Sequence, residues 1–180
     1  MGKQFAELSQ AHQDFIAAQP MFFTGTAARD GKVNISPKGM DSLRVLDATT
    51  IAYVNATGSG NETAGHLLDH PRMTLMWCSF DKRPQILRTY GTARAVHPRD
   101  ADWQALAAHL PDVPGARQIY VQSIDLVQTS CGYAVPFMEL VGERDTLRHW
   151  TDDKGPQGIA TYWKDRNQTT LDGLPTKVIE

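Results

Sequence analysis

The stretch Met21–Gly39, MFFTGTAARDGKVNISPKG, decides the fold class of this 180-residue chain. Aromatic and β-branched residues stand on both sides of the turn sequence Arg29-Asp30-Gly31-Lys32. Glycine after aspartate supplies the positive φ that a tight hairpin turn needs. The stretch therefore predicts two antiparallel strands, over residues 21–27 and 33–36, which Pro37 then ends.

Four further segments have the composition of β-strands: TTIAYVN at 49–55, RMTLMWCSF at 72–80, PQILRTYGTARAV at 84–96 and RQIYVQSIDLVQTS at 117–130. The second of them is apolar on both alternating faces, which is typical of a strand packed on two sides. Gly91 predicts a bend or a close backbone approach, and the change of alternation near Ser123 indicates a bulge. Six strands with few helices between them predict a mainly β protein, a small closed or split antiparallel barrel.

Helices are expected on the flanks of this barrel. Apolar residues recur on one helical face over residues 5–16, so we expect an amphipathic helix at the start of the chain. A second helix is expected over residues 99–109, and two short helices over 142–155 and 155–167.

The pattern changes near Cys131, where strands give way to short helices and turns. We therefore expect residues 1–130 to form the barrel domain with its N-terminal helix. Residues 131–180 are expected to form a helical and turn extension that packs on the same domain.

Composition excludes several classes of partner. A net charge of −2 gives no basic field for nucleic acid or for an anionic membrane, so any bound anion requires a local site. No apolar run is long enough to span a bilayer, and the N-terminus has no signal-peptide pattern. The two cysteines form no CxxC pair, which favours reduced thiols. We expect a cytoplasmic protein with neither nucleic-acid nor membrane partners.

The segment Gly58–Arg72, GSGNETAGHLLDHPR, is the strongest candidate for a binding site. Two glycines precede Asn61, a residue type that commonly begins helices, and the helix that follows ends before Pro71. The free N–H groups at such a helix start bind anions, and glycines allow a phosphate to approach the backbone. The alternative is a glycine turn that leads into a capped helix. A Walker loop is excluded because no Gly-Lys-Ser/Thr follows the glycines.

Other candidate residues each have a structural alternative. Lys38, close to Ser36 at the end of a strand, could contact a phosphate or could be a solvated loop charge. Arg88, in the middle of an apolar strand, requires an anion or a structural carboxylate. His66 and His70 have metal-ligand spacing, but no third ligand is evident, so we favour two histidines on the helix surface and no metal. Cys131 has no identifiable base nearby, so we assign it no catalytic role.

Together, the segments FFTGTAARDGKVNISPKG, GSGNETAGHLLDHPRMTLMW and ILRTYGTARAV resemble the pyridoxamine 5'-phosphate oxidase-like, FMN-binding split β-barrel family. The resemblance covers roughly residues 22–127 and implies a six-stranded antiparallel split β-barrel with flanking helices. In this family FMN lies at the interface of a homodimer. The resemblance implies phosphate contacts from the first hairpin and from the helix start, and a flavin-facing strand that carries the arginine. The predicted cofactor-binding residues are Ser36, Lys38, Asn55, Gly60, Asn61, Thr63 and Arg88.

The chain also departs from the vitamin-forming members of this family. Their helix start carries Ser-Arg-Lys, where this chain has Asn61-Glu62-Thr63, and its C-terminal LDGLPTKVIE lacks their arginine- and histidine-bearing strand. The resemblance therefore implies an FMN-binding oxidoreductase that acts on another small molecule, with no catalytic residue assigned. The alternatives are a flavin-binding or flavin-sensing protein without turnover, and a relative that binds a deazaflavin or haem.

Overall fold

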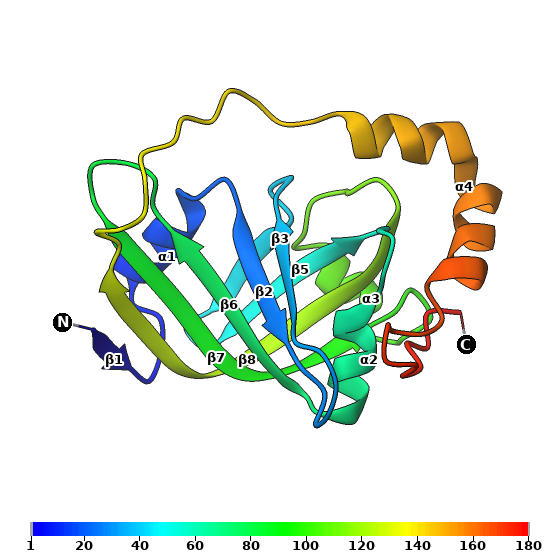
Figure 1. Cartoon of the computed structure of the whole chain (residues 1–180), viewed down its shortest axis with the longest axis horizontal. Coiled ribbons are helices and arrows are strands. Elements are labelled where there is room, and N and C mark those ends of the chain that lie inside the picture. Colours follow the sequence, from blue (N-terminus) through cyan, green and yellow to red (C-terminus); the bar gives the residue numbers. More distant parts are fainter. Residues whose placement is uncertain (1, 180) are drawn as a thin grey trace.

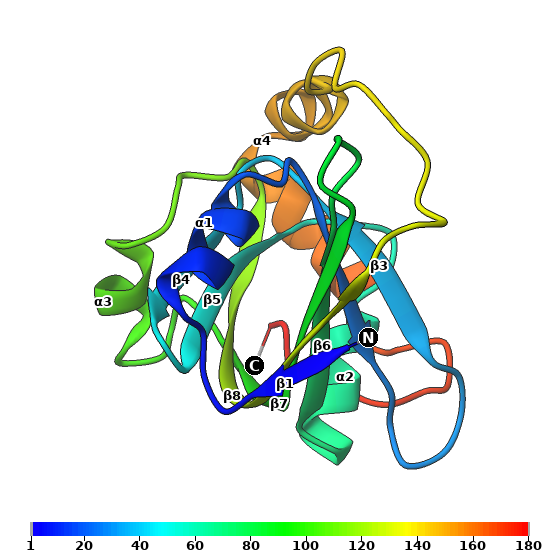
Figure 2. The same ribbon diagram turned by 90° about the vertical axis from the view of Figure 1, so that its left-hand side faces the viewer.

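The hairpin predicted from residues 21–39 is present in the computed structural model, which describes residues 2–179. Its strands belong to one antiparallel sheet with the order β3-β2-β6-β7-β8-β5-β4, and β1 pairs with β8 beside this path (Figure 1). The strands are β1 (Lys3–Phe5), β2 (Phe22–Thr26), β3 (Asn34–Lys38), β4 (Leu43–Asp47), β5 (Thr50–Ala56), β6 (Arg72–Cys78), β7 (Gln85–Val96) and β8 (Ala116–Cys131). The sheet curls around a core but its edges β3 and β4 do not pair, as expected for a split barrel (Figure 2).

All six expected strands are present, and β1 and β4 are two more that the sequence pattern did not indicate. The first helix starts later than expected because Ser9 caps it with a capping box. The residues before Ser9 are therefore free to pair with β8, with Lys3 opposite Thr129. Strand β3 runs through Pro37, which an edge strand tolerates because one side of it has no ladder partner.

In the described part of the chain, four helices flank the sheet: α1 (Gln10–Ala17), α2 (Glu62–Asp69), α3 (Trp103–Ala107) and α4 (Thr146–Arg166). Helix α3 is shorter than the span predicted over residues 99–109. Helix α4 consists of two helices that meet at Gly155, whose φ of 61° and ψ of 173° are not helical. Pro156 opens the second of them, a position where its missing N–H costs nothing. The two predicted C-terminal helices are thus confirmed.

The core fills the inside of the curled sheet. Phe22 contacts both Tyr53 and Trp77 there, with ring centroids 5.2 and 6.0 Å apart. A second, smaller cluster lies on the outer side of β5 and β8, where Ile119 and its neighbours pack against α3. Strand β5 and the first part of β8 are therefore buried on both faces.

The close backbone approach that was one of the two predictions for Gly91 is confirmed, and so is the bulge in β8. A Cβ at Gly91 would lie 1.9 Å from the backbone oxygen of Ser123, so only glycine fits there. Tyr90 pairs with Leu126 but Gly91 pairs with Ile124, which leaves one extra residue in β8. Such a bulge bends the strand pair and helps the sheet to curl.

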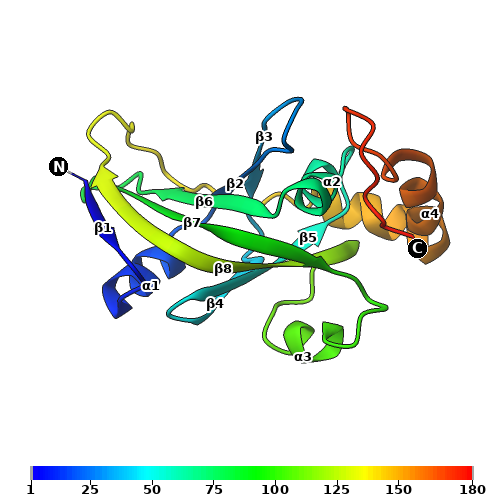
Figure 3. The same ribbon diagram turned by 90° about the horizontal axis from the view of Figure 1, so that it is seen from below.

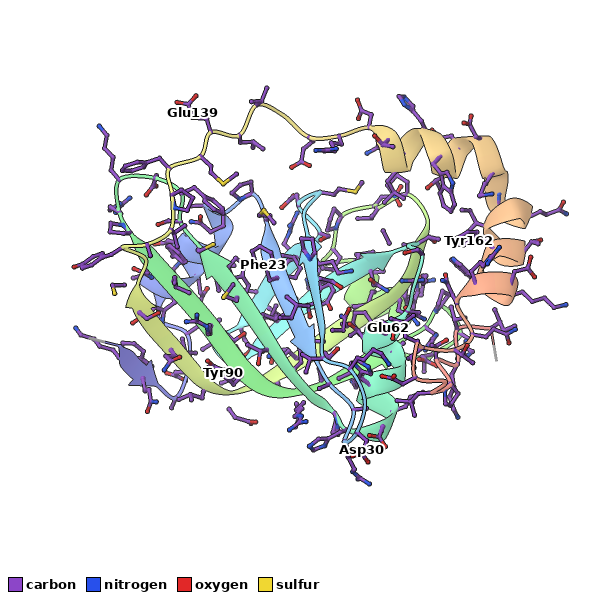
Figure 4. The ribbon with its side chains drawn as sticks, viewed as in Figure 1. Phe23, Asp30, Glu62, Tyr90, Glu139 and Tyr162 are labelled. Atoms are coloured by element: carbon purple, nitrogen blue, oxygen red, sulfur yellow. The ribbon has the colours of Figure 1, made fainter. Side chains whose placement is uncertain are left out.

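The C-terminal part of the chain runs over one side of the barrel. Residues 132–145 cross as a strap without regular structure, and Glu139 points outward from it (Figures 1 and 4). Figure 3 shows α1 near one end of the sheet, with α2, α4 and the C-terminal turn near the other. Within residues 2–179, no helix combines the length and the apolar character needed to cross a membrane.

Candidate functional site

A cavity of about 650 Å³ lies between edge strand β3 and strand β5, which is next to the opposite edge of the sheet. Edge strand β3, the end of β5, the loop at 57–61, the start of α2 and the start of β8 all line it. Its volume is in the range of small-molecule and cofactor sites. Six of the seven predicted binding residues line this cavity: Ser36, Lys38, Asn55, Gly60, Asn61 and Thr63.

Strand β3 supplies one wall of the cavity through its alternating side chains. Asn34, Ser36 and Lys38 share a face because side chains alternate along a strand, and Ile35 points to the other face and is 69% exposed. Ser36 Oγ donates to Asn34 Oδ1 at 3.1 Å, and Lys38 Nζ donates to Asn55 Oδ1 at 3.1 Å. The last bond joins β3 to β5 across the split.

The ammonium group of Lys38 is held in an unfavourable environment. Burial, and to a smaller extent the positive charge of Arg117, lowers the pKa of Lys38 from 10.5 to about 8. Both effects disfavour the charged form of Lys38. A bound anion would offset the repulsion from Arg117.

The start of α2 supplies the opposite wall. Asn61 occupies the N-cap position, as expected, but its side chain makes no capping hydrogen bond. It lies instead 3.4 Å from the Tyr120 hydroxyl, and it is only 2% exposed. Thr63 Oγ1 accepts from Asn34 Nδ2 at 3.4 Å. The first N–H groups of the helix therefore lack the usual side-chain acceptor, which leaves them available to a ligand.

Glu62 is the one carboxylate among the residues that line the cavity. Its Oε2 accepts a hydrogen bond from the backbone N–H of Leu171 at 3.0 Å. The side chain thus engages the C-terminal turn (Figure 4).

Two residues of β8, Arg117 and Tyr120, line the cavity, and a third, Gln118, contacts lining residues; none of them was predicted from the sequence. Arg117, Gln118 and Tyr120 are buried, with exposures of 3%, 0% and 0%. Gln118 Oε1 accepts from Asn55 Nδ2 at 3.0 Å, and the Tyr120 hydroxyl lies 3.4 Å from the same oxygen. Burial raises the pKa of Tyr120, so this phenol stays protonated. The sequence signal that could have indicated these residues is the presence of Arg117 and Gln118 directly before the apolar residues 119–121.

Buried donors without acceptors gather at this site. Asn61 Nδ2, Arg117 Nε and Gln118 Nε2 have no hydrogen-bond partner among the described residues. Asn61 and Arg117 line the cavity, and because buried polar groups are normally satisfied, their two unpaired donors point to a ligand rich in acceptors.

Within residues 2–179, the positive charges at the cavity have no carboxylate in ion-pair distance. Within the described part of the chain, the ion pairs are Lys32 with Asp172, Arg44 with Asp41 and Arg94 with Asp102. Neither Lys38 nor Arg117 has such a partner in residues 2–179. Because buried charges are usually paired, this arrangement is typical of an anion site.

Arg88, the seventh predicted residue, does not line this cavity. Its neighbours Leu87 and Thr89 point into the core with 0% exposure, so Arg88 points to the opposite face of β7. Its Nη1 donates to Ser130 Oγ at 3.2 Å. It lines a separate hollow of about 550 Å³, together with Phe23, Val33, Ile35, Met76 and Tyr90.

The expectation of two surface histidines on α2 is wrong for His66. This residue is 1% exposed, and its Nδ1 lies 3.1 Å from Thr26 Oγ1, because its side of the helix packs against β2. Residues 2–179 contain no group of three or more histidine, cysteine or acidic side chains that could hold a metal ion.

Comparisons with known proteins agree with this architecture. The family model described as pyridoxamine 5'-phosphate oxidase matches residues 8–131. A pyridoxamine 5'-phosphate oxidase family protein of Aspergillus flavus, ustO, is 32% identical over 191 residues, which cover 95% of this chain and 76% of that protein.

Two solved structures share the fold. HupZ of Group A Streptococcus has a TM-score of 0.52 at 20% identity and covers 66% of this chain and 91% of its own. A Clostridium acetobutylicum protein of the pyridoxinephosphate oxidase family, related to general stress protein 26, has a TM-score of 0.51 at 12% identity. That match covers 74% of this chain and 92% of that protein.

Proposed function

This chain belongs to the pyridoxamine 5'-phosphate oxidase family, and from that premise we propose that it binds FMN in the cavity at the split of its barrel. The observation that carries the proposal is the pair of cations Lys38 and Arg117, which face one cavity without a carboxylate partner in the described residues. A phosphate group supplies the missing negative charge and accepts several hydrogen bonds at once. The uncapped start of α2 offers further donors to the same group.

The surroundings of the cavity also fit the rest of a flavin. A second hollow of about 610 Å³ adjoins it, and the two share Lys38, Met40 and Leu147. The second hollow is lined largely by apolar side chains, among them Met21 and Trp150. A ligand with an anionic end and a planar aromatic end matches this change from polar to apolar walls.

A bound flavin would supply the redox chemistry of an oxidoreductase that acts on a small molecule. In this proposal, Lys38, Arg117, Thr63 and the backbone around Gly60 hold the phosphate, while Asn55 and Gln118 orient Lys38. Vitamin-forming activity is not part of the proposal. The helix start has Asn61-Glu62-Thr63 in place of Ser-Arg-Lys, and the C-terminal sequence lacks the arginine- and histidine-bearing strand of the vitamin-forming members.

A flavin-binding or flavin-sensing protein without turnover is the second candidate. It is favoured by the lack of a spare acid or base among the side chains that line the cavity. Glu62 is engaged by Leu171, the phenol of Tyr120 is buried, and Lys38 is assigned to the phosphate.

A homodimer is also part of the proposal. Val33 and Ile35 are each 69% exposed at the hollow that contains Arg88, and such apolar surface is typical of an interface. Because Arg88 lies outside the cavity of its own chain, it could contact a flavin only across such an interface.

The proposal is tested by the visible spectrum of the purified protein, followed by titration with FMN and with riboflavin. FMN should bind more tightly than riboflavin, since only FMN carries the phosphate. A colourless protein that binds neither ligand would overturn the proposal, and a Soret band or a deazaflavin spectrum would redirect it. Bleaching of bound FMN by a nicotinamide donor would then distinguish an enzyme from a binding protein.

A further inference from the structure

The loop before α2 is held by carbonyl contacts to two buried side chains. Arg117 Nη2 donates to the oxygen of Gly60 at 2.9 Å, and Arg117 Nη1 lies 3.5 Å from the oxygen of Gly58. Asn167 Nδ2 donates to the oxygen of Gly58 at 3.1 Å and lies 3.5 Å from that of Ser59. Three successive carbonyls therefore face Arg117 and Asn167.

This orientation determines where the N–H groups of the loop point. In a trans peptide the C=O and the following N–H point in opposite directions, and residues 2–179 contain no cis peptide bond. The N–H groups of Ser59, Gly60 and Asn61 therefore point away from Arg117 and Asn167. These are the residues whose backbone lines the cavity before the helix start.

Asn167 completes the arrangement with both ends of its amide. Its Oδ1 accepts from Arg117 Nη1 at 2.6 Å while its Nδ2 donates to the loop, and the residue is fully buried. An aspartate here would still accept from Arg117, but it would lose the bond to Gly58 and neutralise the guanidinium. Asparagine is therefore the residue that fixes Arg117 and leaves its charge uncompensated.

The C-terminal segment holds Asn167 in place from several directions. Asn167 follows the last residue of α4, and its own N–H donates to the oxygen of Trp163 at 2.9 Å. Trp163 Nε1 donates to Thr57 Oγ1 at 2.8 Å, which ties the helix to the loop itself. The negative end of the helix dipole thus lies beside the buried guanidinium and stabilises it without a carboxylate.

We propose that Asn167 is a positioning residue of the anion site, which fixes Arg117 and the 58–60 loop around a phosphate without cancelling the positive charge. This inference rests on the proposed function, and it assigns a role to the C-terminal segment that the barrel alone does not provide.

The test compares Asn167→Asp with the parent protein and with Gln168→Glu. Gln168 is the exposed neighbour of Asn167, so its variant adds the same charge outside the site. Asn167→Asp should keep the melting temperature of the ligand-free protein, lower FMN affinity tenfold or more and leave riboflavin affinity unchanged. A purely structural role for Asn167 would instead weaken both ligands together with the melting temperature. Gln168→Glu should bind both ligands like the parent.

The outcomes separate the two proposals. If the parent does not bind FMN, the proposed function fails. If the parent binds FMN and a folded Asn167→Asp binds it equally well, only the role of Asn167 fails. Should the aspartate variant not fold by circular dichroism, Asn167→Ser decides instead, because it adds no charge. A folded serine variant that loses FMN affinity but keeps riboflavin affinity supports the inference, and parental binding of FMN overturns it.

Discussion

Lys38 Nζ donates to Asn55 Oδ1 at 3.1 Å, and this bond links edge strand β3 to β5, which lies next to the opposite edge of the sheet. The two residues thus meet across the split of the barrel, at the base of the cavity. Asn55 is 3% exposed and is itself held by Gln118, so the ammonium group has a fixed position. The gap that keeps the sheet from closing is therefore the place where the candidate site is built.

The first prediction concerns pH and FMN affinity. Lys38 has a pKa of about 8, so its positive charge is present at pH 7 and is lost from the ligand-free protein as pH rises through 8. FMN affinity should then fall by about tenfold between pH 7 and pH 9, because binding must recover the lost proton. Titrations at fixed ionic strength measure this, and Lys38→Met should bind FMN with no such pH dependence. Equal pH profiles for Lys38→Met and the parent would contradict the assignment.

The same pKa predicts the pH dependence of stability without ligand. The folded-state pKa of Lys38 is lowered, so the unfolded chain binds more protons between about pH 8 and the unfolded value of 10.5. In that window the contribution of this residue to the free energy of unfolding rises with pH. Lys38→Met should consequently stabilise the protein most below pH 8, and this advantage should vanish toward pH 10.5. Urea unfolding of both proteins at several pH values tests this.

A third prediction addresses the phosphate directly. Lys38→Ala should weaken FMN by roughly 1.5–3 kcal/mol, about ten- to a hundredfold, because a charge-assisted hydrogen bond is lost. Riboflavin affinity should change little, since riboflavin has no phosphate. An equal loss for both ligands would show that Lys38 acts on another part of the flavin.

Much of the fold could be predicted from the sequence because its signals are local. The Asp-Gly turn, the alternation in the strands and Gly91 each depend on a few adjacent residues. Strand β1 could not be predicted, because its pairing with β8 involves residues more than a hundred positions away. The later start of α1 depends on the cap at Ser9, which competes with the apolar periodicity that begins at Phe5.

The candidate site could be predicted only where its residues belong to local sequence patterns. Lys38 and Asn61 follow recognisable strand and helix ends, so their positions could be inferred. Arg117 was missed because its role depends on Asn167, fifty positions later in the chain. For Arg88, the sequence shows that it alternates with buried residues but does not show which hollow its face borders, and its flavin contact stays a prediction.

A fourth prediction tests the close contact of β7 and β8. Gly91→Ala should destabilise the protein by about 3 kcal/mol or more, because the new methyl group collides with the backbone of Ser123. Gly142→Ala is the matched control, since a Cβ there meets nothing within 4 Å. Its free energy of unfolding should stay within about 0.5 kcal/mol of the parent. If Gly91→Ala and Gly142→Ala both unfold at the same urea concentration as the parent, the strands β7 and β8 separate easily at Gly91.

The last prediction concerns the helix start, where FMN titration should rank three variants. Gly60→Val should weaken binding most, because a branched side chain blocks the approach of a phosphate to the loop and crowds Glu62, 3.1 Å from the position of a Cβ. Thr63→Ala should weaken it less, through loss of one hydroxyl. Glu62→Gln should leave affinity unchanged or slightly higher, because its carboxylate is bonded to Leu171 and only a repulsive charge is removed.

Gly58→Ala serves as the control for the glycine substitution, since a Cβ at Gly58 has only the oxygen of Gly60 near it, at 4.0 Å. It should bind FMN much like the parent. Circular dichroism must show that all four variants fold. If Gly60→Val and Thr63→Ala then bind FMN as tightly as the parent, the loop is a glycine turn before a helix, and the phosphate must lie elsewhere in the cavity.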